Sequence, residues 1–241
     1  MASPLAQFEI KTLIPLQVAG YDISFTNSAL FMAITVAAIM FFMTVGMRKG
    51  ALVPGRWQLC VEMCYEFIAN MLHDTAGRDA RKYFPFIFTL FMFILFANLI
   101  GMTPYFGFTF TSHIAVTFAM ASFVFIGVTI IGLAKHGFKF FKLFVPAGAP
   151  LALMPLLVVI ELVSYLSRPI SLSVRLFANM VAGHTMLKVF GGFVVALGAL
   201  GVVPFAFIVA LTGLELLVAC LQAYVFAILT CMYLNDALHL H

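Results

Sequence analysis

The sequence predicts an all-α integral membrane protein that combines transmembrane helices with an amphipathic interfacial helix and a long, strongly tilted two-helix hairpin. Of its 241 residues, 64% are hydrophobic and only 9% are charged, whereas soluble domains are about 45–50% apolar and about 25% charged. A chain of this length cannot bury so much apolar surface in a core of its own. The composition therefore argues for one membrane domain, residues 1–241, and against a soluble globular protein.

Three stretches have the length and composition of ordinary membrane spans. They cover residues 27–47, 84–103 and 113–134. About 20 helical residues cross about 30 Å of hydrocarbon, because each residue adds about 1.5 Å. Charged residues interrupt the apolar pattern of residues 1–26, so we do not expect this segment to be a signal peptide. We expect that segment to be a short arm at the periplasmic membrane surface.

The basic residues predict the orientation of these spans. The formal net charge is +4, but Lys and Arg are distributed among loops and spans without a basic stripe, so we expect no nucleic-acid partner. Basic loops follow the first span, precede the second and follow the third. All three loops lie in the cytoplasm only if the N-terminus lies on the opposite, periplasmic side.

An amphipathic helix is expected between the first two spans, at residues 56–76. Its polar residues Gln58, Glu62, Glu66 and Asn70 recur every four positions and form a separate stripe. Such a helix is better suited to lying on a membrane than to crossing it. The polar face is either solvated or docked against a neighbouring subunit.

The four cysteines do not form a recognisable metal motif. Cys60 and Cys64 lie one helical turn apart, but no histidine or second cysteine pair completes a ligand set. We expect Cys60, Cys64, Cys220 and Cys231 to be small buried hydrophobes. Neither a metal nor a cofactor is predicted.

The last third of the chain is too long for simple spans. Residues 150–190 have a helical pattern that would extend about 60 Å, twice the hydrocarbon thickness. This helix either breaks near Pro169, which can kink it without ending it, or lies strongly tilted. The glycine pair at 191–192 and the segment that follows predict a turn. A second long helix at 204–235 would complete the hairpin.

Polar side chains of the first long helix share one face when each residue turns the helix by about 100°. This stripe consists of Glu161, Ser164, Arg168, Ser171, Arg175 and Asn179. His184 falls on the opposite face. On the second long helix, Glu215 and Gln222 also share a stripe.

These polar residues have two interpretations. They are either snorkelling groups and contacts between packed helices, or functional groups. For Arg168 the structural interpretation has at least as much weight as the functional one. Arg175 lies within an uninterrupted apolar pattern, where an arginine requires an anionic partner or water. Because Glu161 is too far along the helix to pair with it, we expect the partner of Arg175 on another chain.

Arginine differs chemically from the titratable residues beside it. With a pKa above about 12 it does not release its proton, so it can hold a nearby carboxylate ionised and block a proton path. His184 and Glu215 can instead exchange protons near neutral pH. This combination suggests two proton paths that do not join directly.

Three segments together resemble subunit a of F-type ATP synthases. They are "SLSVRLFANMVAGH" (171–184), "LELLVACLQAYVFAILTCMYL" (214–234) and "FANLIGMTPYFGFT" (96–109). The resemblance covers nearly the whole chain. Some bacterial members of that family carry glutamate where His184 stands and histidine where Glu215 stands. The swapped pair of this chain is also familiar from mitochondrial members.

The resemblance implies a stator that works against a rotating ring of c subunits, each with one essential carboxylate. Arg175 would meet that carboxylate and separate two offset half-channels. The path from the periplasm would be lined by Asn179, His184, Glu215 and Gln222. The cytoplasmic exit would be lined by Glu161 and Ser164, with Arg168 and Ser171 as weaker candidates.

The same resemblance implies the partners and location of the chain. The amphipathic helix would face the b subunits of the peripheral stalk, and the long helices would lie in the lipid bilayer. The subunit would couple proton-motive force to ATP synthesis without being an enzyme on its own. We expect a multi-pass protein of a bacterial inner (plasma) membrane, in preference to a mitochondrial-type inner membrane.

Two other functions fit an apolar chain with a buried arginine. A stand-alone secondary transporter or channel would use the arginine as an anion site at the membrane midplane, although no internal repeat is visible. A structural membrane scaffold would tolerate loss of Arg175. Solute flux from the chain alone would indicate the transporter, whereas the stator requires its ring.

Overall fold

The protein is described here from a computed structural model that covers residues 9–15, 17–18, 21–22, 24–48, 50–51, 53–103, 108–144 and 153–239. Within these residues the chain is almost entirely helical. Its α-helices are α1 (Asn27–Met47), α2 (Arg56–Ala76), α3 (Phe84–Gly101), α4 (Ile114–His136), α5 (Met154–Leu197) and α6 (Val202–Leu238). Short 3-10 helices are η2 (Arg78–Tyr83), η3 (Phe110–Ser112), η4 (Gly137–Phe144) and η5 (Gly198–Gly201).

In the described part of the chain, five helical segments are long and apolar enough to cross a membrane. They contain α1, α3, α4, α5 and α6. Helix α2 is not among them, because charged and amide side chains recur along one of its faces. The protein is therefore an all-α, multi-pass membrane protein, as the sequence predicts.

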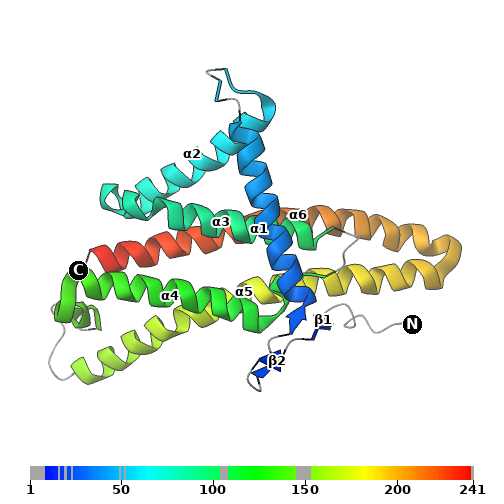
Figure 1. The fold of residues 1–241 in the computed structure, drawn as a ribbon. Coiled ribbons are helices and arrows are strands. Elements are labelled where there is room, and N and C mark those ends of the chain that lie inside the picture. The colour runs from blue at the N-terminus through cyan, green and yellow to red at the C-terminus, as the bar shows by residue number, and fades with distance from the viewer. Residues whose placement is uncertain are drawn as a thin grey trace.

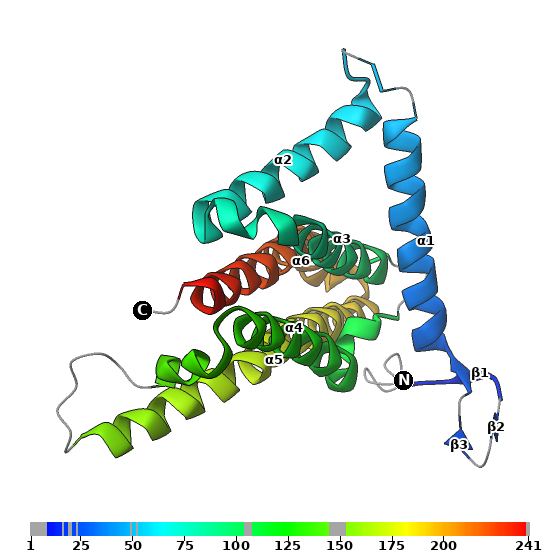
Figure 2. The same ribbon diagram turned by 60° about the vertical axis from the view of Figure 1, so that its left-hand side comes forward.

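Helix α6 is the centre of the fold. It packs against α2, α3, α4 and α5. In Figure 1, α5 and α6 lie side by side up to the turn near residue 200, and the turn end of this pair projects beyond the other helices. Figure 2 shows α2 running back from the end of α1 towards the start of α3. The long hairpin is thus held by shorter helices over only part of its length.

Small residues allow this close packing around α6. Ala219, Ala223, Ala227 and Cys231 lie four positions apart on one face and are fully buried. Apolar side chains gain little by leaving lipid for protein, so helices in membranes associate through close contact of such small residues. Large buried side chains of neighbouring helices, including Ile94, Leu172 and Leu176, complete the same core.

The hairpin turn lies in the later part of the segment in which the sequence predicts it. Helix α5 begins at Met154, continues through Pro169 without a break, and includes the glycine pair at 191–192; residues 150–152 lie outside the described residues. The glycine pair is therefore helical, at a cost of about 1 kcal/mol per glycine, and the turn forms in the rest of the predicted segment.

Two other glycines make the turn. Gly198 has a φ of +57°, a conformation that glycine adopts without steric cost. A Cβ at Gly201 would lie 2.5 Å from the carbonyl oxygen of Val194. Helix α6 then begins at Val202, and Pro204 fits its first turn, where a missing N–H breaks no helix hydrogen bond.

The arm before α1 contains short strands that the sequence does not predict. Strand β1 (Thr12–Ile14) pairs antiparallel with β4 (Phe25–Thr26), and β2 (Gln17–Val18) pairs with β3 (Tyr21–Asp22). Asn27 ties the arm to α1, because its amide donates to the Glu9 carbonyl at 3.1 Å and accepts from the Lys11 N–H at 3.2 Å. Strands of two or three residues are too short to leave a pattern in the sequence. The arm was predicted at 1–26, of which residues 1–8, 16, 19–20 and 23 lie outside the described residues.

Two of the four cysteines are not buried. Cys231 is buried and Cys64 is partly buried, but Cys60 and Cys220 are exposed. The prediction for Cys60 and Cys220 was wrong. Cys220 lies on a helix apolar enough to span a membrane, where an apolar side chain can face lipid, and Cys60 lies on an exposed face of α2.

We predict that Ala223→Leu weakens the fold. The larger side chain enters a fully buried face that α6 uses against its neighbours, and such overpacking costs about 1–3 kcal/mol. Thermal unfolding of the purified chain in detergent measures the loss. Ala210→Leu makes the same change at an exposed position of α6, and equal effects of both variants would contradict the packing argument.

Candidate functional site

Polar side chains connect α5 and α6 at three levels of the hairpin. Near the C-terminus of the chain, Arg168 Nη1 donates to Asp236 Oδ2 at 3.1 Å. At the middle level, Asn179 Nδ2 donates to Gln222 Oε1 at 3.0 Å. At the third, His184 Nε2 lies 3.8 Å from Glu215 Oε1. The antiparallel register thus brings together two pairs that the sequence analysis expects in one half-channel.

Arg168 is engaged within its own chain. Besides Asp236, its guanidinium lies over the rings of Tyr165 and Tyr233, at 5.2 Å and 4.9 Å from their centroids. A cation over an aromatic face is held by the quadrupole of the ring. These contacts favour the structural interpretation of Arg168, as a connection between the two long helices.

Glu215 is buried beside a small pocket. Its side chain is 8% exposed, and within the described residues neither carboxylate oxygen has a hydrogen-bond partner. A Cβ at Gly183 would lie 2.5 Å from Glu215 Oε1, so a larger residue there would displace the carboxylate from this position. The pocket has a volume of about 170 Å³ and is also lined by Asn179, Met186 and Leu211. This space can hold several water molecules beside the acid.

His184 is reached from a segment far away in the sequence. Its Nε2 lies 2.9 Å from the hydroxyl of Thr109, in the segment before η3. Thr109 is buried, and a Cβ at Gly101 would collide with it. Gly101, at the end of α3, therefore lets the segment before η3 pack closely against α3. In this position Thr109 reaches His184 of α5.

Buried Asn98 of α3 extends the polar contacts around His184 and Glu215. Asn98 is fully buried; its amide nitrogen donates to the Ala219 carbonyl at 3.3 Å, and its oxygen accepts from Thr111 at 3.3 Å. His113 follows η3, and within the described residues its buried Nε2 has no hydrogen-bond partner. Burial lowers the pKa of His113, because the charged ring loses hydration. A polar cluster thus leads from the α3–α4 connection to His184 and Glu215.

The residues of this connection were missed by the sequence reasoning. Asn98 and Thr109 lie in a stretch quoted for its resemblance, but no role was assigned to either. The available signal was a run of hydroxyl residues in a turn without Lys or Arg, "TPYFGFTFTSH". Nothing in that run indicates that its hydroxyls are buried against a helix about 75 positions later.

Arg175 lies apart from these pairs. Its side chain is exposed on the outer face of α5, whereas Leu172 and Leu176 on the inner face are buried. Among the described residues, no carboxylate oxygen lies within 4 Å of its guanidinium. Ile170 and Val174, its neighbours on this face, are exposed as well. A permanent cation is therefore presented on an apolar outer surface.

The remaining members of the predicted stripe share this outer face. Ser164 and Ser171 are exposed and Glu161 is partly exposed. Within the described part of the chain, Glu161 has no ion pair with Arg175 or with another basic residue. The described residues also contain no cluster of three or more His, Cys, Asp or Glu that could hold a metal ion.

Comparisons with known proteins identify the family. The sequence profile described as "ATP synthase A chain" matches residues 29–235. The chain is 63% identical to "ATP synthase subunit a" of Parvibaculum lavamentivorans, over 98% of this chain and 93% of that protein. It is 60% identical to the protein of the same name from Pelagibacter ubique, over 99% and 98%. For Paramagnetospirillum magneticum the identity is 58% over the full length of both proteins. The chain therefore belongs to the ATP synthase A chain family.

Proposed function

We propose that this chain is the stator subunit of the membrane sector of a rotary ATP synthase. It passes protons to and from carboxylates on a rotating ring of c subunits, through two offset half-channels that Arg175 keeps apart. The observation that carries the proposal is the position of Arg175, exposed on an apolar face with no acid of the described residues within 4 Å.

The outer face of α5 suits a moving acidic partner. An unpaired cation in hydrocarbon is costly, so the guanidinium requires an anion supplied from outside the chain. A ring carboxylate that passes this face would be held ionised next to Arg175 and neutral where lipid surrounds it. Because arginine does not release its proton, it cannot itself become a link in a proton path.

The buried cluster supports an entry path on the other side of α5. A proton arriving through the Thr109 region would meet His184, whose ring lies 3.8 Å from Glu215. Both groups accept and release protons, which is what a relay requires. Asn179 and Gln222 continue the polar line from the Glu215 pocket towards the face of Arg175.

The exit path is displaced along the same outer face. Glu161 lies fourteen positions before Arg175, which corresponds to about 21 Å along a helix. Ser164 and Ser171 fall between them and are exposed. A ring site would therefore gain its proton at one place and lose it at another. This offset converts proton flow into rotation, since each charge crossing the membrane potential releases about 2.3 kcal/mol per 100 mV.

The same proposal assigns the partners and orientation. The polar face of α2, where Gln58 donates to Glu62 at 2.8 Å and Glu66 is exposed, docks the b subunits of the peripheral stalk. The hairpin lies strongly tilted in the bilayer, because α5 alone has 44 residues. The N-terminal arm faces the periplasm of a bacterial inner membrane. The chain itself breaks no covalent bond, and catalysis of ATP synthesis resides elsewhere in the complex.

We predict that Arg175→Ala reduces ATP-driven proton pumping in inverted membrane vesicles more than tenfold, since nothing then separates the two paths or ionises the ring carboxylate. Arg48→Ala, which removes another exposed cation, directly after α1, is the control and keeps pumping. The assembled complex is compared with the chain alone. Undiminished pumping by Arg175→Ala, or solute flux through the chain without its ring, would refute the stator function.

We also predict that Gly183→Ala slows passive proton flux through the membrane sector severalfold, because the new methyl group displaces the Glu215 carboxylate. Gly191→Ala on the same helix is the matched control, since a Cβ there meets nothing within 4 Å. Adding Glu215→Asp, which shortens the acid, should partly restore flux to Gly183→Ala. Equal flux in both alanine variants would remove Glu215 from the entry path.

A further inference from the structure

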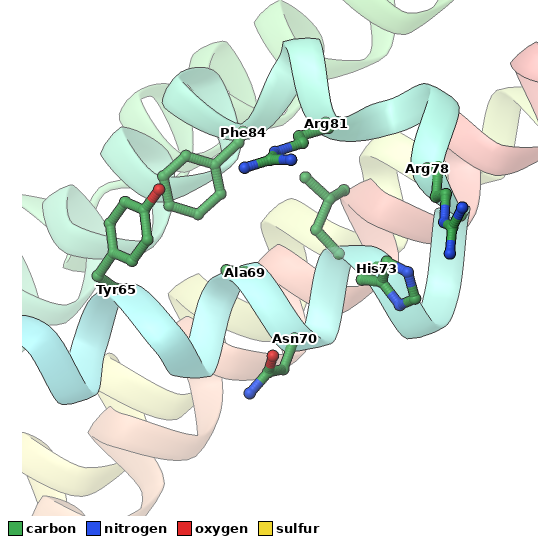
Figure 3. A pocket seen from close by; sticks show the side chains of 9 residues that line it. Tyr65, Ala69, Asn70, His73, Arg78, Arg81 and Phe84 are labelled. Atoms are coloured by element: carbon green, nitrogen blue, oxygen red, sulfur yellow. The ribbon is translucent and has the colours of Figure 1, made fainter.

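A basic cleft lies between α2 and the start of α3, away from the hairpin polar groups. It has a volume of about 530 Å³, which falls within the range of small-molecule sites, about 300–1,000 Å³. Its walls include Tyr65, Leu72, His73, Arg78, Arg81 and Phe84. In Figure 3 the guanidinium of Arg81 projects over the space between the two helical segments, and Arg78 lies nearer the turn that joins them.

The positive charge of the cleft is not neutralised within the described chain. Arg78 and Arg81 are exposed, and no described carboxylate oxygen lies within 4 Å of either guanidinium. The two nearby acids have other neighbours, since Asp79 lies 4.0 Å from Lys135 and Asp74 lies 3.5 Å from His73. Two guanidinium groups therefore remain available to an anion.

The two ends of the cleft differ in polarity. The rings of Tyr65 and Phe84 pack 4.6 Å apart at one end, and Arg78 with His73 forms the other (Figure 3). Phe84 is also the first residue of α3, within a segment apolar enough to span a membrane. The candidate span runs from Arg78 to Gly101, so both arginines lie at its beginning, where we expect lipid head groups, and Phe84 lies further along it, where we expect the hydrocarbon boundary.

We propose that this cleft binds the phosphate head group of an anionic phospholipid. Arg78 and Arg81 donate to the phosphate oxygens, which the planar guanidinium fork fits well. The part of an acyl chain nearest the head group lies along Tyr65 and Phe84. Basic pockets between membrane helices are suited to anionic head groups. The apolar end distinguishes a lipid from free phosphate, which has no use for aromatic walls.

Native mass spectrometry of the detergent-purified membrane sector tests this site. Phosphatidylglycerol should bind at least fivefold more tightly than phosphatidylcholine. The double variant Arg78→Gln and Arg81→Gln should lose this preference. The matched control, Arg48→Gln with Arg56→Gln, removes two exposed cations that do not line the cleft and should keep it. Retained preference in the cleft variant, or equal binding of both lipids by the unaltered complex, would overturn the proposal.

Additional measurements identify the source of the phosphate. They also keep the proposal testable if the double variant does not assemble. Inorganic phosphate in excess should leave phosphatidylglycerol bound. Complete displacement of the lipid would indicate a site for free anions and would overturn the proposal of a lipid site. Binding by the isolated chain but not by the assembled sector would mean that a protein neighbour covers the cleft, which also overturns it. In the unaltered complex, raising ionic strength from about 0.05 M to about 0.5 M should weaken the preference severalfold, and an unchanged preference would contradict it.

Discussion

A permanent charge on an apolar surface is the constraint on which the rest of this structure depends. Along α5 and α6, Arg168 is paired with Asp236 and His184 lies beside Glu215. Each of these basic side chains therefore has an acidic side chain of the same chain beside it. Arg175 has no such neighbour among the described residues. An uncompensated cation in hydrocarbon is costly. In the proposed function, an acid on another polypeptide compensates it, and the exposed apolar side chains around Arg175 provide the surface against which that polypeptide packs.

Close helix packing makes the inner polar pairs feasible. Four small residues on one face of α6 allow neighbouring helices to approach, and Asn98 of α3 reaches the backbone carbonyl of Ala219 within that contact. Gly183 has the same effect on α5, where any larger residue would meet the Glu215 carboxylate. Buried polar groups are tolerated only where partners or water are within reach. The small residues therefore determine both the stability of the bundle and the position of its titratable groups.

Much of this architecture was predictable because lipid restricts the backbone. A span must satisfy its own hydrogen bonds and is therefore a helix, so hydropathy alone indicates its approximate limits. Helical periodicity also separated the faces of α5, with Arg175 outside and His184, half a turn away, inside. Contacts between distant segments were not predictable, as with Thr109 and His184. Nor was the exact position of the turn, since Gly191 and Gly198 both lie in the predicted turn segment, yet Gly191 is helical and only Gly198 has a positive φ. Exposure of Cys60 and Cys220 likewise depends on which helix faces pack against other helices.

The two faces of α5 also explain why an amide pair lies between the titratable groups and the arginine. In the proposed function, a proton must pass from the inner His184–Glu215 pair to the outer face. Asn179 belongs to the outer stripe, yet its amide donates to Gln222, which is buried. Amides neither hold a proton nor carry charge near neutral pH, but they orient hydrogen-bonded neighbours. A proton can thus cross this level in contact with water from the pocket but cannot remain there. A charged residue at the same level would either compete with the ring carboxylate for Arg175 or repel the incoming proton, so neutrality at this position follows from the fixed cation beside it.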